Sequence, residues 1–174
     1  MRCFIAIDLP ENIKKELYNR ALELYNLGLF KGKITEKGNL HLTLKFLGEI
    51  SEKKIEEVKK KLREVKEKKF KAKLAEFGVF SEKSVRIIWV HLSGAENLQK
   101  EIDEKLEGLF KKDKRFVGHI TIARVKSCEK KNLIDKIKKI NLKEEFFVEN
   151  FKLLCSELTS SGPIYSTLEN FELE

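Results

Sequence analysis

Two short stretches of the chain carry the same arrangement of a histidine and a threonine. Residues 41–44 read His-Leu-Thr-Leu, and residues 119–122 read His-Ile-Thr-Ile. In a β-strand successive side chains point to opposite faces, so the histidine and threonine of each copy share one face. Each copy can therefore bury two aliphatic side chains in a core and present an imidazole and a hydroxyl on the other side.

Paired histidines suit proton transfer at a phosphorus centre. Imidazole titrates near ~6.5, so one histidine can accept a proton while its partner donates one at neutral pH. In a displacement at phosphorus, the base takes a proton from the attacking oxygen and the acid gives one to the leaving oxygen. The hydroxyls of Thr43 and Thr121 can donate to the non-bridging oxygens. On these grounds alone the roles of His41 and His119 are interchangeable.

Two cationic residues follow the motifs. Lys45 continues the alternation of His41 and Thr43, so we expect it on the same face, where it would add fixed positive charge to a phosphate site. Arg124 falls formally on the face opposite His119. It can reach the same site only if the strand twists strongly or contains a bulge.

The two histidines could also have a structural role or bind a metal ion. A single His-x-Thr-x is more often a structural strand, but two copies in equivalent places favour a shared site. A zinc site would also use histidines, yet neither motif has Cys, Asp or Glu on its histidine face, so we predict no metal.

We expect His91 to be structural and Trp89 to lie in the core. The three cysteines are widely spaced and are expected to be free thiols in a reducing cytosol.

Composition limits the class of protein. The chain has 174 residues, of which 41% are hydrophobic and 37% are charged, so a folded protein with a strongly charged surface is expected. Its Lys- and Glu-rich charge resembles that of thermophile proteins. The net charge of +8 favours an acidic partner such as nucleic acid. No apolar run is long enough for a signal peptide or a membrane span, so we expect a cytoplasmic protein.

Hydrophobic periodicity predicts an alternation of strands and helices. Strands are expected over residues 3–7, 41–48, 70–80, 85–92, 119–125, 146–158 and 165–173. Helices are expected over about 10–27, 51–65, 98–109 and 133–140. The glycine- and lysine-rich residues 28–39 are expected to form a loop, and residues 159–163 a turn.

Each half of the chain thus contains a strand, a helix, the His-x-Thr-x strand, a second helix and a further strand. Asp8, Ser51 and Ser93 stand before helices, where their side chains can cap the helix N-termini, and Ser127 precedes the last helix. Ser51 and Ser127 are each soon followed by Glu-Lys-Lys, which strengthens the case for a repeat. We predict an α+β fold of duplicated, bilobal β-α-β-α-β units. Antiparallel sheets would face a central cleft with the helices outside, in one domain over residues 1–174.

The motifs and their surroundings resemble a known family. Residues 1–10 read MRCFIAIDLP, residues 40–48 read LHLTLKFLG and residues 118–124 read GHITIAR, and residues 156–158 and 162–165 fit as well. With these features the chain resembles the two-histidine (2H) phosphoesterases, specifically the RNA 2′,3′-cyclic phosphodiesterase family, also called 2′-5′ RNA ligases. One departure is Gly118, where the family commonly has proline.

The resemblance implies a metal-independent and cofactor-free hydrolysis of RNA 2′,3′-cyclic phosphate ends. His41 would be the proton donor to the leaving 3′ oxygen and His119 the proton acceptor that activates water, leaving a 2′-phosphate. Thr43 and Thr121 would bind the phosphate, with Lys45, Arg124 and Tyr165 as further substrate-binding candidates. The expected partner is RNA with a cyclic phosphate end, such as a tRNA fragment, bound by a monomer.

Three alternatives remain open. The same chemistry run with an RNA hydroxyl in place of water would join 2′-5′ RNA ends. A small cyclic nucleotide could be the substrate, and its binding would depend less on salt than that of RNA. A noncatalytic RNA- or nucleotide-binding module would bind cyclic-phosphate ends without turnover. Tyr165 and Phe46 are candidates for base stacking in any of these cases.

Overall fold

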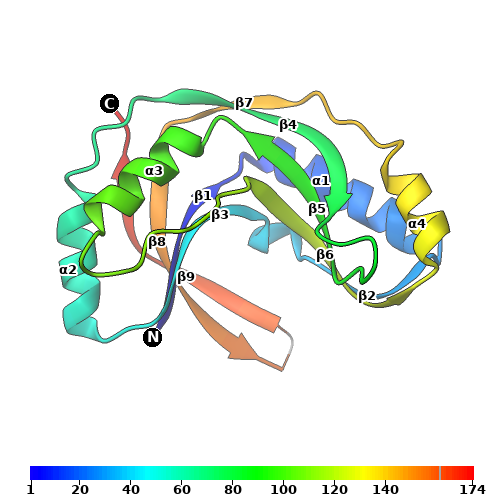
Figure 1. Ribbon diagram of the computed structural model, residues 1–174, viewed down its shortest axis with the longest axis horizontal. Coiled ribbons are helices and arrows are strands. Elements are labelled where there is room, and N and C mark those ends of the chain that lie inside the picture. Colours follow the sequence, from blue (N-terminus) through cyan, green and yellow to red (C-terminus); the bar gives the residue numbers. More distant parts are fainter. Residues whose placement is uncertain (161) are drawn as a thin grey trace.

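The computed structural model describes residues 1–160 and 162–174, and over these it is an α+β protein with two lobes (Figure 1). The helices are α1 (Glu11–Asn26), α2 (Glu52–Leu62), α3 (Glu96–Lys105) and α4 (Lys130–Ile137). The strands are β1 (Arg2–Asp8), β2 (Phe30–Ile34), β3 (His41–Glu49), β4 (Phe70–Val79), β5 (Ile87–Ser93), β6 (His119–Cys128), β7 (Glu145–Val148), β8 (Asn150–Thr159) and β9 (Gly162–Glu172). One short 3₁₀ helix, η1 (Lys37–Asn39), precedes β3.

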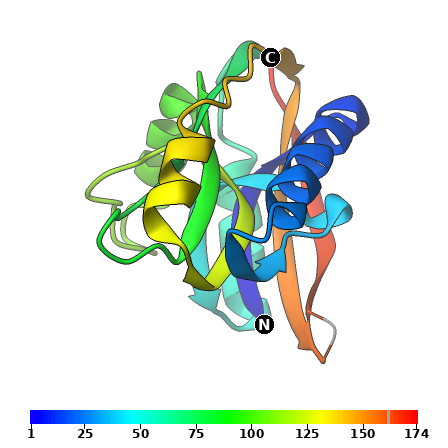
Figure 2. The ribbon, with the colours of Figure 1, turned by 90° about the vertical axis from the view of Figure 1, so that its right-hand side faces the viewer.

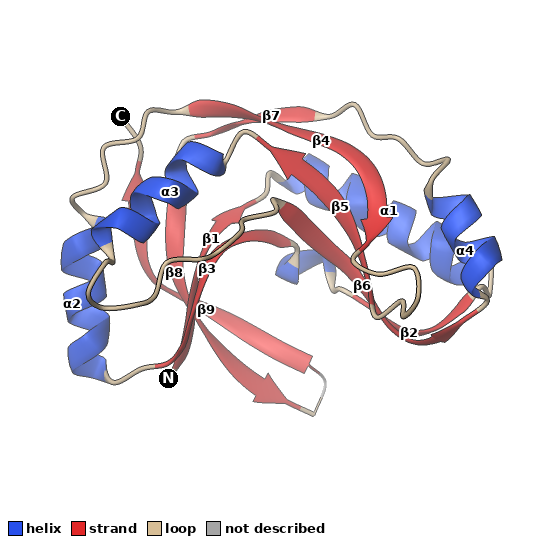
Figure 3. Cartoon of the chain, viewed as in Figure 1, coloured by secondary structure: helices blue, strands red, loops and turns tan. Residues whose placement is uncertain are grey.

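The strands form two antiparallel sheets, one in each lobe. The first sheet has the order β3-β1-β8-β9, and the second has the order β2-β6-β5-β4-β7. Helices α2 and α3 flank the first sheet, whereas α1 and α4 flank the second, all on the outside of the molecule (Figures 1 and 3). Figure 2 shows α1 and α4 on the side of the molecule that faces the viewer, with α4 in front of strands of the second sheet. The predicted α+β class with outer helices and antiparallel sheets is confirmed.

The lobes do not coincide with the two halves of the sequence. Strand β4, from the first half, pairs with β5 and β7 in the second sheet, and β8, from the second half, pairs with β1 in the first sheet. Residues 146–158, which we expected to form one strand, are therefore two strands, β7 and β8, that belong to different sheets. Each lobe is completed by chain from the other half of the sequence.

The loop expected over residues 28–39 is wrong in part. Strand β2 forms here and pairs antiparallel with β6. Gly32 allows the close pairing, because a Cβ at this position would lie 2.1 Å from the backbone oxygen of Arg124. Exposed lysines alternating around a glycine do not have the composition of a strand, so the pattern gave no signal of it.

Of the three expected helix caps, at Asp8, Ser51 and Ser93, one is present. The Ser51 hydroxyl accepts a hydrogen bond from the Lys54 amide at 3.3 Å, as predicted. Ser93 and Ser127 lie in β5 and β6, and the capping positions belong to Ala95 and Glu129, neither of which makes a side-chain cap. For Ser127 the cause is one extra residue between the serine and Glu-Lys-Lys, which Ser51 does not have. This residue moves Ser127 away from the start of α4.

Asp8 does not cap α1 either, because Pro10 occupies the N-cap position. The Asp8 carboxylate instead binds Lys14 at 2.6 Å and Lys152 at 2.8 Å. The turn predicted at residues 159–163 joins β8 to β9, but Ser161 in this turn lies outside the described residues. The β8–β9 hairpin extends away from the body of the molecule (Figure 1).

A β-bulge in β3 changes which side chains face the cleft. Ile5 of β1 is opposite Lys45, but the next residue, Ala6, is opposite Thr43, so Leu44 is an extra residue in β3. Leu44 and Lys45 are consequently both buried. The prediction that Lys45 shares the face of His41 and Thr43 is therefore wrong, because the bulge turns its side chain into the interior.

Strand β6 contains the same irregularity at the same distance from its histidine. Ile88 of β5 is opposite Ala123, whereas Trp89 is opposite Thr121, which again leaves one extra residue. Ala123 is buried, and Arg124 is exposed and lines the cleft. We expected Arg124 to reach the cleft only through strong strand twist or a bulge, and the bulge is present.

The buried Lys45 is the centre of a polar network that reaches the segment before His119. Its ammonium group forms an ion pair with Asp103 of α3 and donates to the backbone oxygen of Lys111 at 2.9 Å. It also approaches the Asp113 carboxylate at 3.4 Å. Gln99 of α3 donates to the same Asp103 carboxylate at 2.9 Å. The network joins β3, α3 and the basic segment that leads into β6.

Replacing Lys45 with methionine should destabilise the protein, because the buried Asp103 carboxylate would lose its cation. Removing one partner of a buried ion pair costs ~3–5 kcal/mol, and urea unfolding measures the difference. Lys100→Met is the matched control. Its side chain is 77% exposed and 4.0 Å from Glu104, and an exposed substitution changes stability by only about 0.5 kcal/mol. Equal unfolding free energies for the two variants would contradict a structural role for Lys45.

Candidate active site

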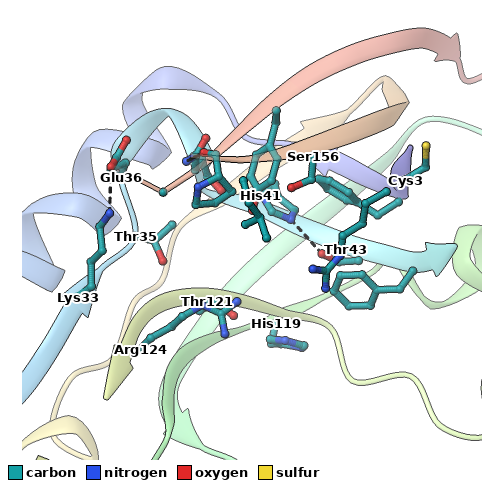
Figure 4. Close-up of a pocket in the computed structure, with 18 of the residues that line it drawn as sticks. Cys3, Lys33, Thr35, Glu36, His41, Thr43, His119, Thr121, Arg124 and Ser156 are labelled. Carbon is teal, nitrogen blue, oxygen red and sulfur yellow. Dashed lines mark hydrogen bonds and ion pairs between the residues drawn. The ribbon is translucent and has the colours of Figure 1, made fainter. Parts of the chain in front are cut away.

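A cleft of about 560 Å³ lies where the two His-x-Thr-x strands approach each other. Figure 4 shows His41 and Thr43 on one side of it and His119, Thr121 and Arg124 on the other. Of the predicted site residues, the cleft brings together all but Lys45. The residues that line it are Arg2, Cys3, Phe4, Lys33, Ile34, Thr35, Glu36, Asn39, His41, Thr43, Phe46, Gly48, His119, Thr121, Arg124, Ser156, Leu158, Gly162, Pro163 and Tyr165.

The His41 ring is held by hydrogen bonds at both nitrogens. Its Nδ1 lies 2.7 Å from the backbone oxygen of Asn39, and its Nε2 lies 2.9 Å from the Thr43 hydroxyl. A carbonyl oxygen can only accept, so the proton of a neutral ring resides on Nδ1 and Thr43 donates to Nε2. Nε2 is therefore the nitrogen that can exchange a proton with a ligand.

The His119 ring is oriented by an equivalent contact. Its Nδ1 lies 2.7 Å from the backbone oxygen of Val117, two residues before it, as Asn39 is two residues before His41. The same tautomer follows, and Nε2 is again the nitrogen available for proton transfer. The two imidazoles thus have equivalent hydrogen bonds at Nδ1, from the segments that lead into equivalent strands.

Burial makes His41 harder to protonate. Loss of solvent lowers the pKa of His41, and neither its hydrogen bond to the Asn39 carbonyl nor the nearby Asp8 carboxylate fully offsets this effect. The His119 ring also acts on His41, in the direction that lowers its pKa. In the free protein His41 is consequently neutral at pH 7.

Aromatic rings surround both histidines, and sequence reasoning missed most of them. Phe4 and Tyr165 lie 5.0 and 5.3 Å from the His41 ring, between ring centres. Phe80 and Trp89 lie 4.9 and 6.5 Å from the His119 ring. The expectation that Trp89 is a core residue is wrong, because it is half-buried on the same face of the sheet as His119.

Positive charge gathers around Tyr165. Burial raises the pKa of its phenol, while Arg124 and Arg2 act in the opposite direction. Arg2 and Tyr165 belong to the first sheet and Arg124 to the second, and all three line the cleft. Two guanidinium groups from opposite lobes can therefore act on a bound phosphate.

Gly118 has a structural reason to be glycine here. A Cβ at this position would lie 2.1 Å from the backbone oxygen of Leu92, and the Gly118 carbonyl accepts a hydrogen bond from the Leu92 amide at 3.0 Å. The start of β6 therefore lies closer to β5 than a residue with a side chain would permit. This close contact fixes the strand directly before His119.

Asn39 has two functions at the cleft. Its carbonyl orients His41, and its side-chain amide donates to the backbone oxygen of Pro163 at 2.9 Å, which attaches the β8–β9 hairpin to the 3₁₀ turn. No sequence signal could identify the first function, because every residue has a carbonyl. His91, which we expected to be structural, lies opposite His119 in the strand pairing and 3.6 Å from Glu76, and it does not line the cleft.

Over residues 1–160 and 162–174, no group of three or more His, Cys, Asp or Glu side chains could hold a metal ion. In the same residues, no helix is both long and apolar enough to cross a membrane.

The pKa of His41 leads to a prediction about its titration. Because burial lowers this pKa, the His41 ring should take up its proton below the ordinary value of ~6.5, and the unfolded chain should bind that proton more tightly. His41 therefore contributes stability that is lost as the pH falls through this range. NMR titration of the imidazole resonances, with His41→Asn to identify its signal, measures the pKa. A value at or above the ordinary one would contradict the burial argument.

Comparison with known proteins identifies the family. A family model described as LigT like Phosphoesterase matches residues 7–89 and 92–165, and each matched stretch carries one His-x-Thr-x motif. A Methanocaldococcus jannaschii protein named RNA 2′,3′-cyclic phosphodiesterase is 41% identical, and the alignment covers 98% of this chain and 100% of the relative. A protein of the same name from Thermotoga maritima is 37% identical, with 100% of this chain and 96% of the relative covered.

The fold has a close solved counterpart. A crystal structure of a Thermus thermophilus protein superposes with a TM-score of 0.85 at 29% sequence identity, covering 99% of this chain and 97% of the other. The relatives come from thermophiles, in keeping with the Lys- and Glu-rich composition. With the family model matched over most of its length, the chain belongs to the LigT-like family of 2H phosphoesterases.

Proposed function

We propose that the protein hydrolyses 2′,3′-cyclic phosphate ends of RNA to 2′-phosphates by paired-histidine acid–base catalysis. The observation that carries this proposal is the pair of imidazoles at one cleft, each with its Nδ1 at 2.7 Å from a backbone carbonyl two residues earlier. Relatives that bear the name RNA 2′,3′-cyclic phosphodiesterase over their whole length support the substrate class. The net charge of +8 suits a polyanionic substrate.

The reaction is an in-line displacement at phosphorus. A water oxygen attacks the phosphorus atom while its proton passes to Nε2 of His119, and the bond from phosphorus to the 3′ oxygen breaks. Nε2 of protonated His41 gives its proton to that oxygen, which leaves a 3′-hydroxyl and a 2′-phosphate. Thr43, Thr121 and Arg124 stabilise the charge that develops on the non-bridging oxygens. The choice of donor and acceptor follows the family resemblance.

The lowered pKa of His41 bears directly on these roles. A neutral His41 in the free protein is better prepared to accept a proton than to give one. Binding of the substrate reverses this preference, because the negative charge of the phosphate raises the pKa of an adjacent imidazole. In this proposal His41 acquires the proton that it donates when the cyclic phosphate binds beside it.

The cyclic nucleotide is placed by the first lobe. Tyr165 is beside His41, and Phe46, whose side chain is 72% exposed, lines the same cleft. Phe46 faces the cleft because it follows the bulge in β3, as Arg124 follows the bulge in β6. Stacking on one of these rings tolerates any base. With an RNA hydroxyl in place of water, the same steps would produce a 2′-5′ linkage.

A substrate with a better leaving group should separate the two histidines. With an ordinary cyclic phosphate, His41→Ala and His119→Ala should each slow the reaction by ~10²–10⁴-fold. With sulfur in place of the 3′ oxygen, the leaving thiolate needs little help from an acid, so His41→Ala should recover most of its rate. His119→Ala should stay impaired, because water still needs its base.

Product analysis on the cyclic-phosphate oligonucleotide should find a 2′-phosphate in the same experiment. Recovery of His119→Ala instead of His41→Ala on the sulfur substrate would exchange the two roles. Full activity of either variant on the ordinary substrate would refute paired-histidine catalysis. His91→Ala, which changes a histidine outside the cleft, is the matched control and should keep the wild-type rate.

We also propose that the reaction requires no metal ion. Two imidazoles supply both proton transfers and Arg124 supplies positive charge at the phosphate, so each step has a protein group. Incubation with EDTA followed by buffer exchange should therefore leave the hydrolysis rate unchanged. A loss of activity that added Mg²⁺ or Zn²⁺ restores would contradict this part of the mechanism.

A further inference from the structure

The aromatic groups around the two histidines differ in their exposure. On the His41 side, Phe4 is 4% exposed and packs in a small cluster with Ala6, Leu154 and Tyr165. On the His119 side, Phe80 is 55% exposed, although its ring centre is only 4.9 Å from that of His119. An exposed aromatic side chain in contact with the proposed catalytic base has no evident role in the folded core.

The Phe80 ring packs against a second aromatic side chain. It follows directly after β4, and its ring lies 5.5 Å from that of Trp89 at an angle of 41°. The indole in turn lies against Gly78, where a Cβ would come within 2.6 Å of the ring. Gly78 thus makes room for Trp89, and Trp89 packs against Phe80. The result is an aromatic surface with one part open to solvent.

The aromatic surface formed by Phe80 and Trp89 lies on the side from which the attacking group would reach the phosphorus atom. Phe80 and Trp89 contact the His119 ring but do not line the main cleft, which contains Tyr165, Phe46 and both threonines. The cyclic nucleotide has its own aromatic neighbours in that cleft. In an in-line displacement the attacking group arrives from the side opposite the leaving oxygen. In the proposed mechanism, that is the side of His119 and Phe80.

We propose that Phe80, supported by Trp89, stacks on the base of a second nucleoside whose 5′-hydroxyl attacks the cyclic phosphate. This inference rests on the proposed function. The attacking group at this surface is a nucleoside and not water, because water has no base that could stack on Phe80. Aromatic stacking is strong and tolerant of base identity, so it suits the end of an RNA strand. Phe80 is then the residue that favours strand joining over hydrolysis.

The step is balanced without any further reactant. The 5′ oxygen of the acceptor forms a bond to phosphorus, and the bond from phosphorus to the 3′ oxygen breaks. The hydroxyl proton passes to His119, and His41 gives its proton to the 3′ oxygen. The product is a 2′-5′ phosphodiester with a free 3′-hydroxyl.

The test compares two acceptors for one cyclic-phosphate oligonucleotide. One acceptor oligonucleotide has a complete 5′-terminal nucleoside with a free 5′-hydroxyl, and the other has an abasic sugar at that end. The wild-type protein should transfer to the complete acceptor in preference to the abasic one. Phe80→Ala should lower this preference by roughly 5- to 150-fold, the range expected for one lost stacking contact. Phe80→Trp should retain it.

Phe147→Ala is the matched control, because Phe147 is 66% exposed on β7 and lies outside the cleft. It should keep the wild-type preference. An equal loss of hydrolysis and transfer in Phe80→Ala would overturn the inference, since it would mean that the ring acts through His119. Wild-type transfer that ignores the acceptor base would overturn it too. Wild-type hydrolysis without transfer at any acceptor concentration would refute the acceptor site alone, whereas absence of hydrolysis would refute the proposed function.

Discussion

The extra residue directly after the threonine of each His-x-Thr-x motif is the constraint on which the arrangement of the cleft depends. A regular strand would present the histidine, the threonine and the residue two positions after the threonine on one face. In β3 that residue is Lys45. In β3 the bulge turns Lys45 inward and brings Phe46 to the cleft. The corresponding bulge in β6 brings Arg124 to the cleft. One irregularity, repeated in both strands, thus supplies a ring from one lobe and a guanidinium group from the other.

The buried side of each bulge matters as much as the exposed side. In β6 the inward residue is Ala123, which packs in the core, whereas in β3 it is Lys45, whose charge must be compensated. The compensation comes from Asp103 of α3 and from backbone and carboxylate groups of the segment that leads to His119. Through Lys45, the strand that carries one histidine is connected to the approach to the other.

Sequence patterns predicted the fold class and the residues of the cleft with uneven success. Alternation within the motif identified which side chains of His41 and Thr43 lie together, because the regular part of a strand obeys a period of two. It failed for Lys45, since a bulge arises from the pairing with a neighbouring strand and leaves no mark in the strand's own sequence. Phe80 and Trp89 were missed for a similar reason. Their contact with His119 depends on how β4 and β5 pair, and an aromatic residue in a strand is more often part of a core.

The exchange of strands between the lobes has a consequence for how the chain reaches its native state. Strand β1 pairs on one side with β3, which follows within the first third of the chain, but its other partner is β8, near the C-terminus. During synthesis β1, whose side chains are largely apolar, therefore keeps one edge of unpaired backbone N–H and C=O groups until residues 150–159 have emerged from the ribosome. Contacts of such long sequence separation slow folding, because their ordering cost precedes their stabilisation. The closing of the first sheet is thus a late event, and the cleft is completed only when nearly the whole chain is available.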